Sequence, residues 1–186
     1  GGQTREKVAD SYRAGIEFDG RLQLTKTLSW AATATFSRNK IKEFTEYIYD
    51  KADKTRKTFV KNTFQNTDIS FSPSLIMSSE IAYKPIQNAE IAFISKYVGK
   101  QYLNNLSDDG QSLSSFFVND IRLNYQTAFT GVKNVGLSLL VNNVFNTLYE
   151  SNGASYPSFS KGEVSRYNVY YPQATRNFLL SLSLKF

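Results

Sequence analysis

Residues Arg176–Phe186 read RNFLLSLSLKF, and this stretch has the clearest strand pattern in the chain. Its side chains alternate between two faces, as they do along a β-strand. The length matches the ~9 to 11 residues that a tilted strand needs to cross a bilayer. One face carries Phe178, Leu180, Leu182, Leu184 and Phe186, and the other carries Asn177, Leu179, Ser181, Ser183 and Lys185.

The same period of two recurs upstream. In Leu28–Ser37 large or small apolar residues alternate with small and polar ones, and in Tyr12–Asp19 the second face is charged. A charged face is too costly to bury without partners, so it should face water. Four further segments share the period: Pro73–Tyr83, Glu90–Tyr102, Phe116–Tyr125 and Gly136–Tyr149. The sequence therefore predicts seven antiparallel strands.

The predicted connections alternate in length. Short turns are expected at Thr25–Thr27 and Lys84–Asn88, with an intermediate turn at Thr127–Val135. Long polar loops are expected between them, at Tyr47–Thr67, Asn104–Ser115 and Ser151–Tyr171. Short turns at one end and long loops at the other are typical of outer-membrane barrels, which also carry aromatic girdles. Five tyrosines lie near the predicted strand ends: Tyr83, Tyr97, Tyr102, Tyr125 and Tyr149.

Alternation and tyrosines occur in soluble β-sandwiches too, so this pattern leaves both architectures open. Amino-acid composition excludes several classes of function. The chain has no cysteine and no histidine, which excludes a disulfide framework, a thiolate metal site and hydrolases that depend on imidazole. The net charge of +6 comes with one basic cluster between Lys51 and Lys61, which is typical of a solvated loop, and no nucleic-acid partner is predicted. No apolar run reaches the ~18 residues of a membrane helix.

A resemblance adds to this reading. The features that carry it are the Asn142–Asn146 stretch NNVFN, then Tyr171–Gln173 with Arg176–Phe178, and the terminal Phe186. Together with the upstream segments Ser95–Asn105 and Phe116–Tyr125, they resemble the C-terminal end of TonB-dependent outer-membrane receptors, particularly those of Bacteroidetes-type bacteria.

The resemblance implies an all-β, up-and-down transmembrane barrel of about 22 strands that encloses a plug domain. Residues 1–186 are then expected to be its C-terminal part, with the plug and the earlier strands absent from this chain. The apolar face of the last strand, from Phe178 to Phe186, is implied to be the signal for the barrel-assembly machinery.

Candidate ligand contacts lie in two of the predicted loops. An anionic ligand is attracted by basic residues and held against ring faces, although such a cluster also suits lipopolysaccharide phosphates or plain solvation. The candidates in the first loop are Tyr47, Tyr49, Lys54, Arg56 and Lys57. Those in the second are Tyr156, Phe159, Tyr167 and Tyr170.

Other polar residues are given structural or lining roles. Arg122 and Arg176 are expected on the face away from lipid, where they are candidates for lining the lumen or for contacting the plug. Asn142, Asn143 and Asn146 are expected to satisfy backbone groups where a strand ends. Asp108 and Asp109 are expected to form a turn rather than a Ca²⁺ site, because that ion needs more ligands.

The predicted function is therefore TonB-dependent import of a scarce nutrient across the outer membrane of a Gram-negative bacterium. A ferric siderophore or another metal chelate is favoured over haem, cobalamin or a glycan, and neither a cofactor nor an enzymatic activity is predicted. Expected partners are outer-membrane lipid and lipopolysaccharide, the TonB complex through the missing N-terminal part, the assembly machinery and a surface lipoprotein. The alternatives are a passive porin and a soluble β-sandwich that binds carbohydrate.

Overall fold

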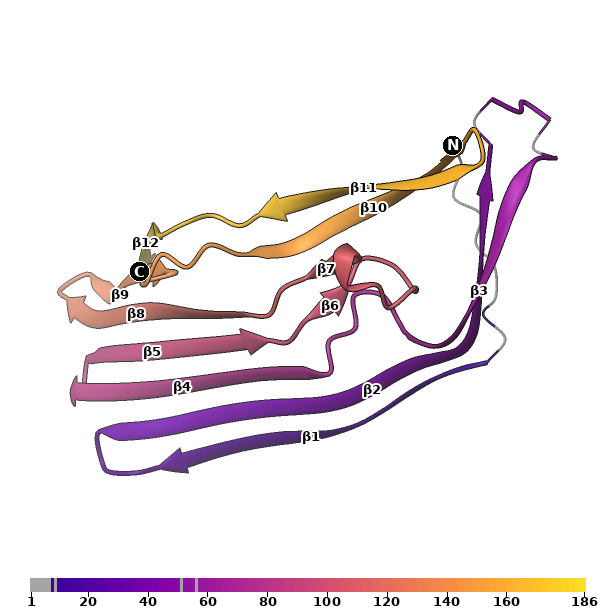
Figure 1. The fold of residues 1–186 in the computed structure, drawn as a ribbon. Coiled ribbons are helices and arrows are strands. Elements are labelled where there is room, and N and C mark those ends of the chain that lie inside the picture. Colours follow the sequence, from indigo (N-terminus) through magenta and orange to yellow (C-terminus); the bar gives the residue numbers. More distant parts are fainter. Residues whose placement is uncertain (1–7, 9, 51, 56) are drawn as a thin grey trace.

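The computed structural model describes residues 8, 10–50, 52–55 and 57–186, and Figure 1 shows them as an open, curved sheet with hairpins extending from one end. Strands make up nearly all of the regular structure, and a short 3₁₀ turn, η1 (Asp109–Gln111), is the helical element of the described part. None of its helical segments is long and apolar enough to span a membrane.

The main sheet contains the seven predicted strands in chain order, each antiparallel to the next. They are β1 (Ser11–Gln23), β2 (Leu28–Tyr49), β4 (Leu75–Ile86), β5 (Ala89–Val98), β8 (Phe116–Phe129), β9 (Val132–Asn142) and β12 (Asn177–Lys185). Within the described residues β1 and β12 each pair on one side only, so the sheet is open.

Short turns lie at one end of the sheet and longer connections at the other, as the sequence predicted. Tight turns join β1 to β2, β4 to β5 and β8 to β9 at the left end of Figure 1, and the longer connections leave from the right end. The β8–β9 turn is tighter than expected, because pairing continues to Phe129 and Val132. Gly131 closes this turn at a φ of +87°, a conformation that glycine adopts without steric cost.

Two of the expected loops are instead β-hairpins, so that part of the prediction was wrong. β2 runs on to Tyr49 and pairs with β3 (Phe59–Asp68), while β10 (Glu150–Ser160) pairs with β11 (Glu163–Pro172). The second half of the Tyr47–Thr67 stretch pairs with the extension of β2, from Lys40 to Tyr49, and the two halves of the Ser151–Tyr171 stretch pair with each other. The sixth strand also ends earlier than expected, at Asn142, because Asn143 and Asn146 take positive φ values.

Pairing register aligns the alternating residues of all seven strands. Trp30 lies opposite Ile81, Phe93 opposite Ile121, and Leu180 opposite Leu139, so the apolar side chains of neighbouring strands share one face. We call this the apolar face and its opposite the polar face. The exposed members of the apolar face are Ile16, Phe18, Leu22, Trp30, Phe36, Met77, Ile81, Tyr83, Ile91, Phe117, Leu123, Tyr125, Leu137, Phe178, Leu180, Leu182 and Leu184.

No second sheet covers the apolar face within the described residues. Phe178 and Leu180 are each 67% exposed and Leu182 is 63% exposed, so no other part of the described chain packs on these side chains. A β-sandwich would bury these side chains between its sheets. The packing therefore favours the barrel wall over the soluble sandwich.

The large buried apolar side chains lie instead at the end of the sheet with the long connections. Leu103, Leu106 and Leu113 belong to the β5–β8 connection, and Ile48 belongs to the extension of β2. This connection also contains β6 (Gln101–Tyr102) and β7 (Ser112–Leu113), which pair with each other. The hairpin end is thus the part of the chain with a conventional core.

Two glycines of β1 test the tight pairing of β1 with β2. A Cβ at Gly15 would lie 2.5 Å from the backbone oxygen of Phe36, whereas a Cβ at Gly20 would meet nothing within 4 Å. Gly15→Ala should lower the free energy of unfolding of the full-length protein by roughly 1–3 kcal/mol, measured by chemical denaturation. Gly20→Ala is the control and should be neutral or slightly stabilising; equal effects of the two changes would contradict the register.

Candidate ligand-binding surface

The β2–β3 hairpin carries a cluster of aromatic rings on one face. Tyr47 lies opposite Lys61, and Tyr49 lies opposite Phe59. The ring centroid of Phe59 is 5.7 Å from that of Tyr47 and 5.6 Å from that of Tyr49. The Lys61 ammonium lies 5.9 Å from the Tyr47 ring centroid, within cation–π range. We call these four residues the β2–β3 aromatic face, and all four are exposed.

The other face of the same hairpin is packed. Ile48 is only 3% exposed and Glu46 is half-buried, because both alternate with the tyrosines and point to the opposite side. Two of the predicted ligand contacts, Tyr47 and Tyr49, therefore belong to the solvent-accessible side of the hairpin.

The turn at the tip of this hairpin is organised by Asp53. Its carboxylate accepts hydrogen bonds from the backbone N–H groups of Thr55, Lys57 and Thr58, at 2.8, 3.0 and 2.8 Å. The hydroxyl of Thr55 donates the hydrogen bond that does most to hold the pKa of Asp53 well below its ordinary value, followed by the backbone N–H of Thr58. Lys54 and Lys57 are both exposed in this turn. Arg56, the remaining candidate, lies outside the described residues.

The four candidates of the β10–β11 hairpin lie on two different faces. Tyr156 is directly opposite Tyr167, and these two rings are 56% and 70% exposed. Phe159 and Tyr170 alternate with them and point to the other side, opposite Val164 and Gly153. We call Tyr156 and Tyr167 the β10–β11 aromatic face. The sequence placed all four residues together, and the hairpin separates them.

The β5–β8 connection is held by its own polar contacts. Asp109 accepts hydrogen bonds from Lys100 at 2.6 Å and from the Tyr102 hydroxyl at 3.1 Å, and the Lys100 bond is the first cause of the lowered pKa of Asp109. Asp108 accepts from the backbone N–H of Gly110 at 2.9 Å and caps the 3₁₀ turn. The predicted Asp108–Asp109 turn is confirmed.

Asn143 and Asn146 satisfy backbone groups after β9, as predicted, whereas the side chain of Asn142 donates to the side chain of Asn177 at 2.8 Å. Thr147 N–H donates to Asn143 Oδ1 at 2.9 Å, and Asn143 Nδ2 donates to the Thr147 carbonyl at 2.8 Å. Asn146 Oδ1 accepts from the backbone N–H of Arg176 at 3.0 Å. The Arg176 side chain also serves this turn, because its Nε donates to the Val144 carbonyl at 2.8 Å.

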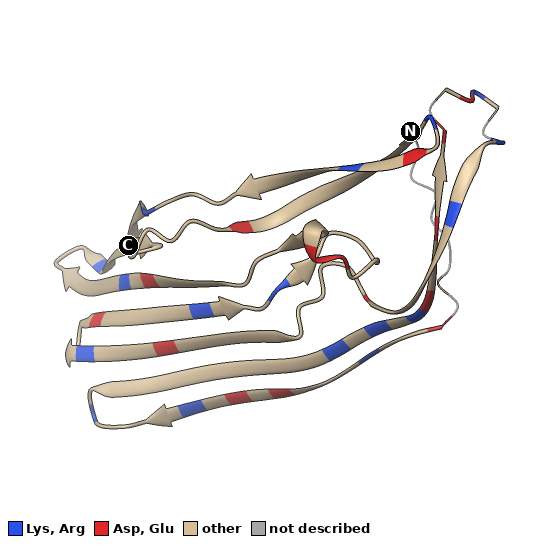
Figure 2. Cartoon of the chain, viewed as in Figure 1, with Lys and Arg blue, Asp and Glu red and all other residues tan. Residues whose placement is uncertain are grey.

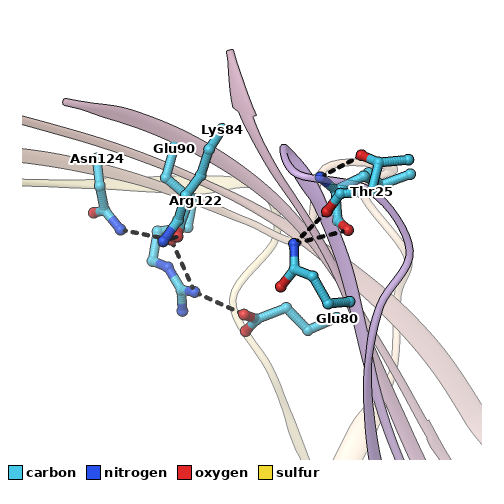
Figure 3. A network of polar contacts seen from close by, with 8 residues as sticks. Thr25, Glu80, Lys84, Glu90, Arg122 and Asn124 are labelled. Atoms are coloured by element: carbon cyan, nitrogen blue, oxygen red, sulfur yellow. Dashed lines mark hydrogen bonds and ion pairs between the residues drawn. The ribbon is translucent and has the colours of Figure 1, made fainter. Parts of the chain in front are cut away.

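Arg122 lies on the polar face between two carboxylates, as Figure 3 shows. Its guanidinium is 3.1 Å from Glu80 and 3.8 Å from Glu90, and Lys84 lies 3.5 Å from Glu90. Figure 2 shows the same pattern along the strands, where acidic and basic residues occur together on β4, β5 and β8. The polar face therefore balances its charges locally.

Sequence reasoning missed the partners that fix these positions. Glu80 and Glu90 were not selected beside Arg122, and Glu46 was not linked to Arg166, which lies on β11 and pairs with it. Each ion pair joins residues of different strands, so it could not be predicted from the spacing of those residues along the chain. No group of three or more carboxylates is arranged to hold a metal ion in residues 8, 10–50, 52–55 and 57–186.

Asp53→Ala tests the order of the β2–β3 tip. Losing the carboxylate that accepts hydrogen bonds from three backbone N–H groups should loosen the turn and speed tryptic cleavage at Lys54 and Lys57 several-fold, as followed by mass spectrometry at pH 8. The pKa of Asp53 is lower in the folded turn than in the unfolded chain. The ionised carboxylate therefore stabilises the turn fully above its ordinary pKa, and this stabilisation is lost as the pH falls through the lowered pKa. The parent turn should therefore be as ordered at pH 5 as at pH 8. Glu163→Ala in the other hairpin is the control, and equal acceleration by both variants would contradict this role.

Comparison with known proteins agrees with this geometry. No protein-family model matches the sequence, and no curated protein does. Among solved structures, the siderophore receptor PiuA from Acinetobacter baumannii matches with a TM-score of 0.67 at 15% identity, over 92% of this chain and 21% of that one. The ferric yersiniabactin uptake receptor FyuA from Yersinia pestis matches with a TM-score of 0.56 at 14% identity, over 91% and 22%. This chain thus spans about a fifth of the length of either receptor, and its fold is similar to a segment of these two structures.

Proposed function

We propose that this chain forms part of the wall and of the ligand-capturing hairpins of an outer-membrane barrel that imports a scarce nutrient with energy from TonB. The observation that carries the proposal is the exposed apolar face, which runs across all seven strands of an otherwise polar protein. Large exposed apolar surfaces of this kind mark contact with lipid or with another protein.

The pairing of strands makes lipid the better partner for this face. A bilayer core offers no hydrogen bonds, so a spanning sheet must pair its backbone groups internally and close on itself. The sheet pairs all seven strands but leaves β1 and β12 open on one side, and it matches only about a fifth of the two receptors. Further strands of a larger barrel, outside this chain, are proposed to complete the wall.

The polar face is proposed to line the lumen. Glu17, Asp19, Arg21 and Arg122 all belong to it, and such residues are costly on a lipid-facing surface but ordinary on a water-filled or plugged interior. The Glu80–Arg122–Glu90 network is proposed as a contact for a plug domain.

The transported ligand is proposed to be an anionic metal chelate, such as a ferric siderophore. The support comes from the β2–β3 aromatic face, where rings and Lys61 offer flat apolar contact beside a positive charge. Both matched receptors are described as binding or taking up iron chelates. Lipopolysaccharide, the assembly machinery and a surface lipoprotein are proposed as further partners, and the outer membrane is proposed as the location.

A charge placed on each face tests the orientation of the wall. Leu182→Arg puts a cation on the apolar face of β12, and Ser181→Arg puts one on the polar face of the same strand. In the full-length protein folded into lipid vesicles, Leu182→Arg should lower the free energy of unfolding by ~2–4 kcal/mol. Ser181→Arg should change it by less than about 1 kcal/mol. A larger loss for Ser181→Arg would reverse the assignment of faces.

Uptake of labelled ferric chelates by cells that produce the full-length protein tests the function. Uptake should stop when an uncoupler collapses the proton gradient, because the proposed import depends on TonB. Tyr47→Ala and Tyr49→Ala should each weaken chelate binding by roughly 0.5–2 kcal/mol, measured on the purified protein.

Phe129→Ala is the matched control, because this exposed ring lies at the turn end of the sheet, away from the hairpins. It should leave chelate affinity unchanged. Uptake that continues after uncoupling would indicate a passive porin. Absence of both chelate binding and uptake would reject the proposed substrate class.

A further inference from the structure

The two hairpins meet at their tips although they leave the sheet from different strands. Asp50 at the end of β2 forms a parallel β-bridge with Phe159 of β10. Below this bridge the Arg166 guanidinium binds the Glu46 carboxylate with two hydrogen bonds, of 2.9 and 2.5 Å. The two side chains are only 18% and 14% exposed, so water screens this pair less than a surface ion pair.

Both hairpins also contact the β5–β8 connection. At the base of the β2–β3 hairpin, the Ser107 hydroxyl of this connection donates to the Asp68 carboxylate at 3.0 Å, and the β10–β11 hairpin makes the other contacts. Ser155 donates to Gln111 Oε1 at 2.8 Å, and Asn168 Nδ2 donates to the Gly110 carbonyl at 2.7 Å. Gly153 lies so close to this connection that a Cβ there would come within 2.9 Å of Leu103. Figure 1 shows the β6–β7 connection between the two hairpins, which converge beyond it.

Alternation along the strands then decides where the rings point. Tyr47 follows Glu46, and Tyr167 follows Arg166, so both tyrosines point away from the ion pair. A β-bridge joins strands edge to edge and puts the bridged side chains on the same side. The packed sides of the two hairpins are therefore continuous near the tips, and their exposed aromatic faces look the same way.

We propose that the Glu46–Arg166 pair clamps the β2–β3 and β10–β11 hairpins into one rigid unit over the β5–β8 connection, so that their two aromatic faces form a single composite binding surface. Glu46 and Arg166 are positioning residues, because they touch each other and not the ligand. The clamp itself does not depend on what is transported; that the composite surface takes an anionic metal chelate rests on the proposed function.

Distance measurements on the full-length protein test the clamp without any ligand. Thr63→Cys and Ser165→Cys place one spin label on each hairpin at exposed positions, and this chain has no cysteine of its own. The parent should give one narrow distance distribution by pulsed electron resonance. Glu46→Gln and Arg166→Gln should each broaden it, and the charge-swapped Glu46→Arg/Arg166→Glu double variant should narrow it again.

Glu43→Gln is the matched control. This carboxylate lies on the same strand but bonds within its own hairpin, to Gln65 at 2.8 Å. An unchanged distribution in Glu46→Gln and Arg166→Gln, or equal broadening in Glu43→Gln, would overturn the clamp.

Chelate binding by the purified protein tests the composite surface. In the parent, the effects of Tyr47→Ala and Tyr167→Ala on the dissociation constant should not be independent. The fold-change in the double variant should differ from the product of the two single fold-changes by about twofold or more. In an Arg166→Gln background the same two changes should be independent. Independence in both backgrounds would overturn the shared surface. If the parent binds no ferric chelate while the distances behave as expected, the proposed substrate fails and the clamp stands.

Discussion

The structure depends on one constraint, which is that the backbone of every strand must pair with its neighbours while one whole face of the sheet stays apolar. Side chains alternate along each strand, so a shift of one residue in any pairing would exchange the apolar and polar faces of that strand. The observed register keeps Trp30, Ile81, Phe93, Ile121, Leu139 and Leu180 on one side across six strands. A continuous apolar surface results from that register and not from any single strand.

The two ends of the sheet differ in how much structure lies beyond the strands. At the turn end the connections are short, and little lies beyond the strands. At the hairpin end Leu103, Leu106 and Leu113 are buried beneath two hairpins that approach from separate places in the wall. This arrangement combines a local hydrophobic core with the half-buried Glu46–Arg166 pair, whose loss would leave a charge without its partner. The exposed rings are thus carried on a packed base rather than on free loops.

Much of the wall could be predicted because its signal is local. The alternation of β12 and the turn after β4 each depend on a few neighbouring residues, and both are present in the structure. The end of β9 was predicted less well, because Asn143 and Asn146 end this strand at Asn142 rather than at Tyr149. The hairpins could not be predicted in the same way. Residues 59–68 and 150–172 are polar, with weak alternation, and they become strands because each finds a partner strand. Tyr156 and Phe159 were grouped by composition, although the strand between them turns their side chains to opposite faces.

The period of two, the number of wall strands and the apolar residues of each strand could all be predicted from the amino-acid sequence, since they follow from the order of residues along the chain. The three-dimensional pairing was needed to show that Arg122 lies between Glu80 and Glu90, that Glu46 binds Arg166, and that Asp50 bridges to Phe159. Those contacts join residues far apart in the chain. They depend on the pairing register of the strands and on how the hairpins converge, and neither can be predicted from the spacing of residues along the chain.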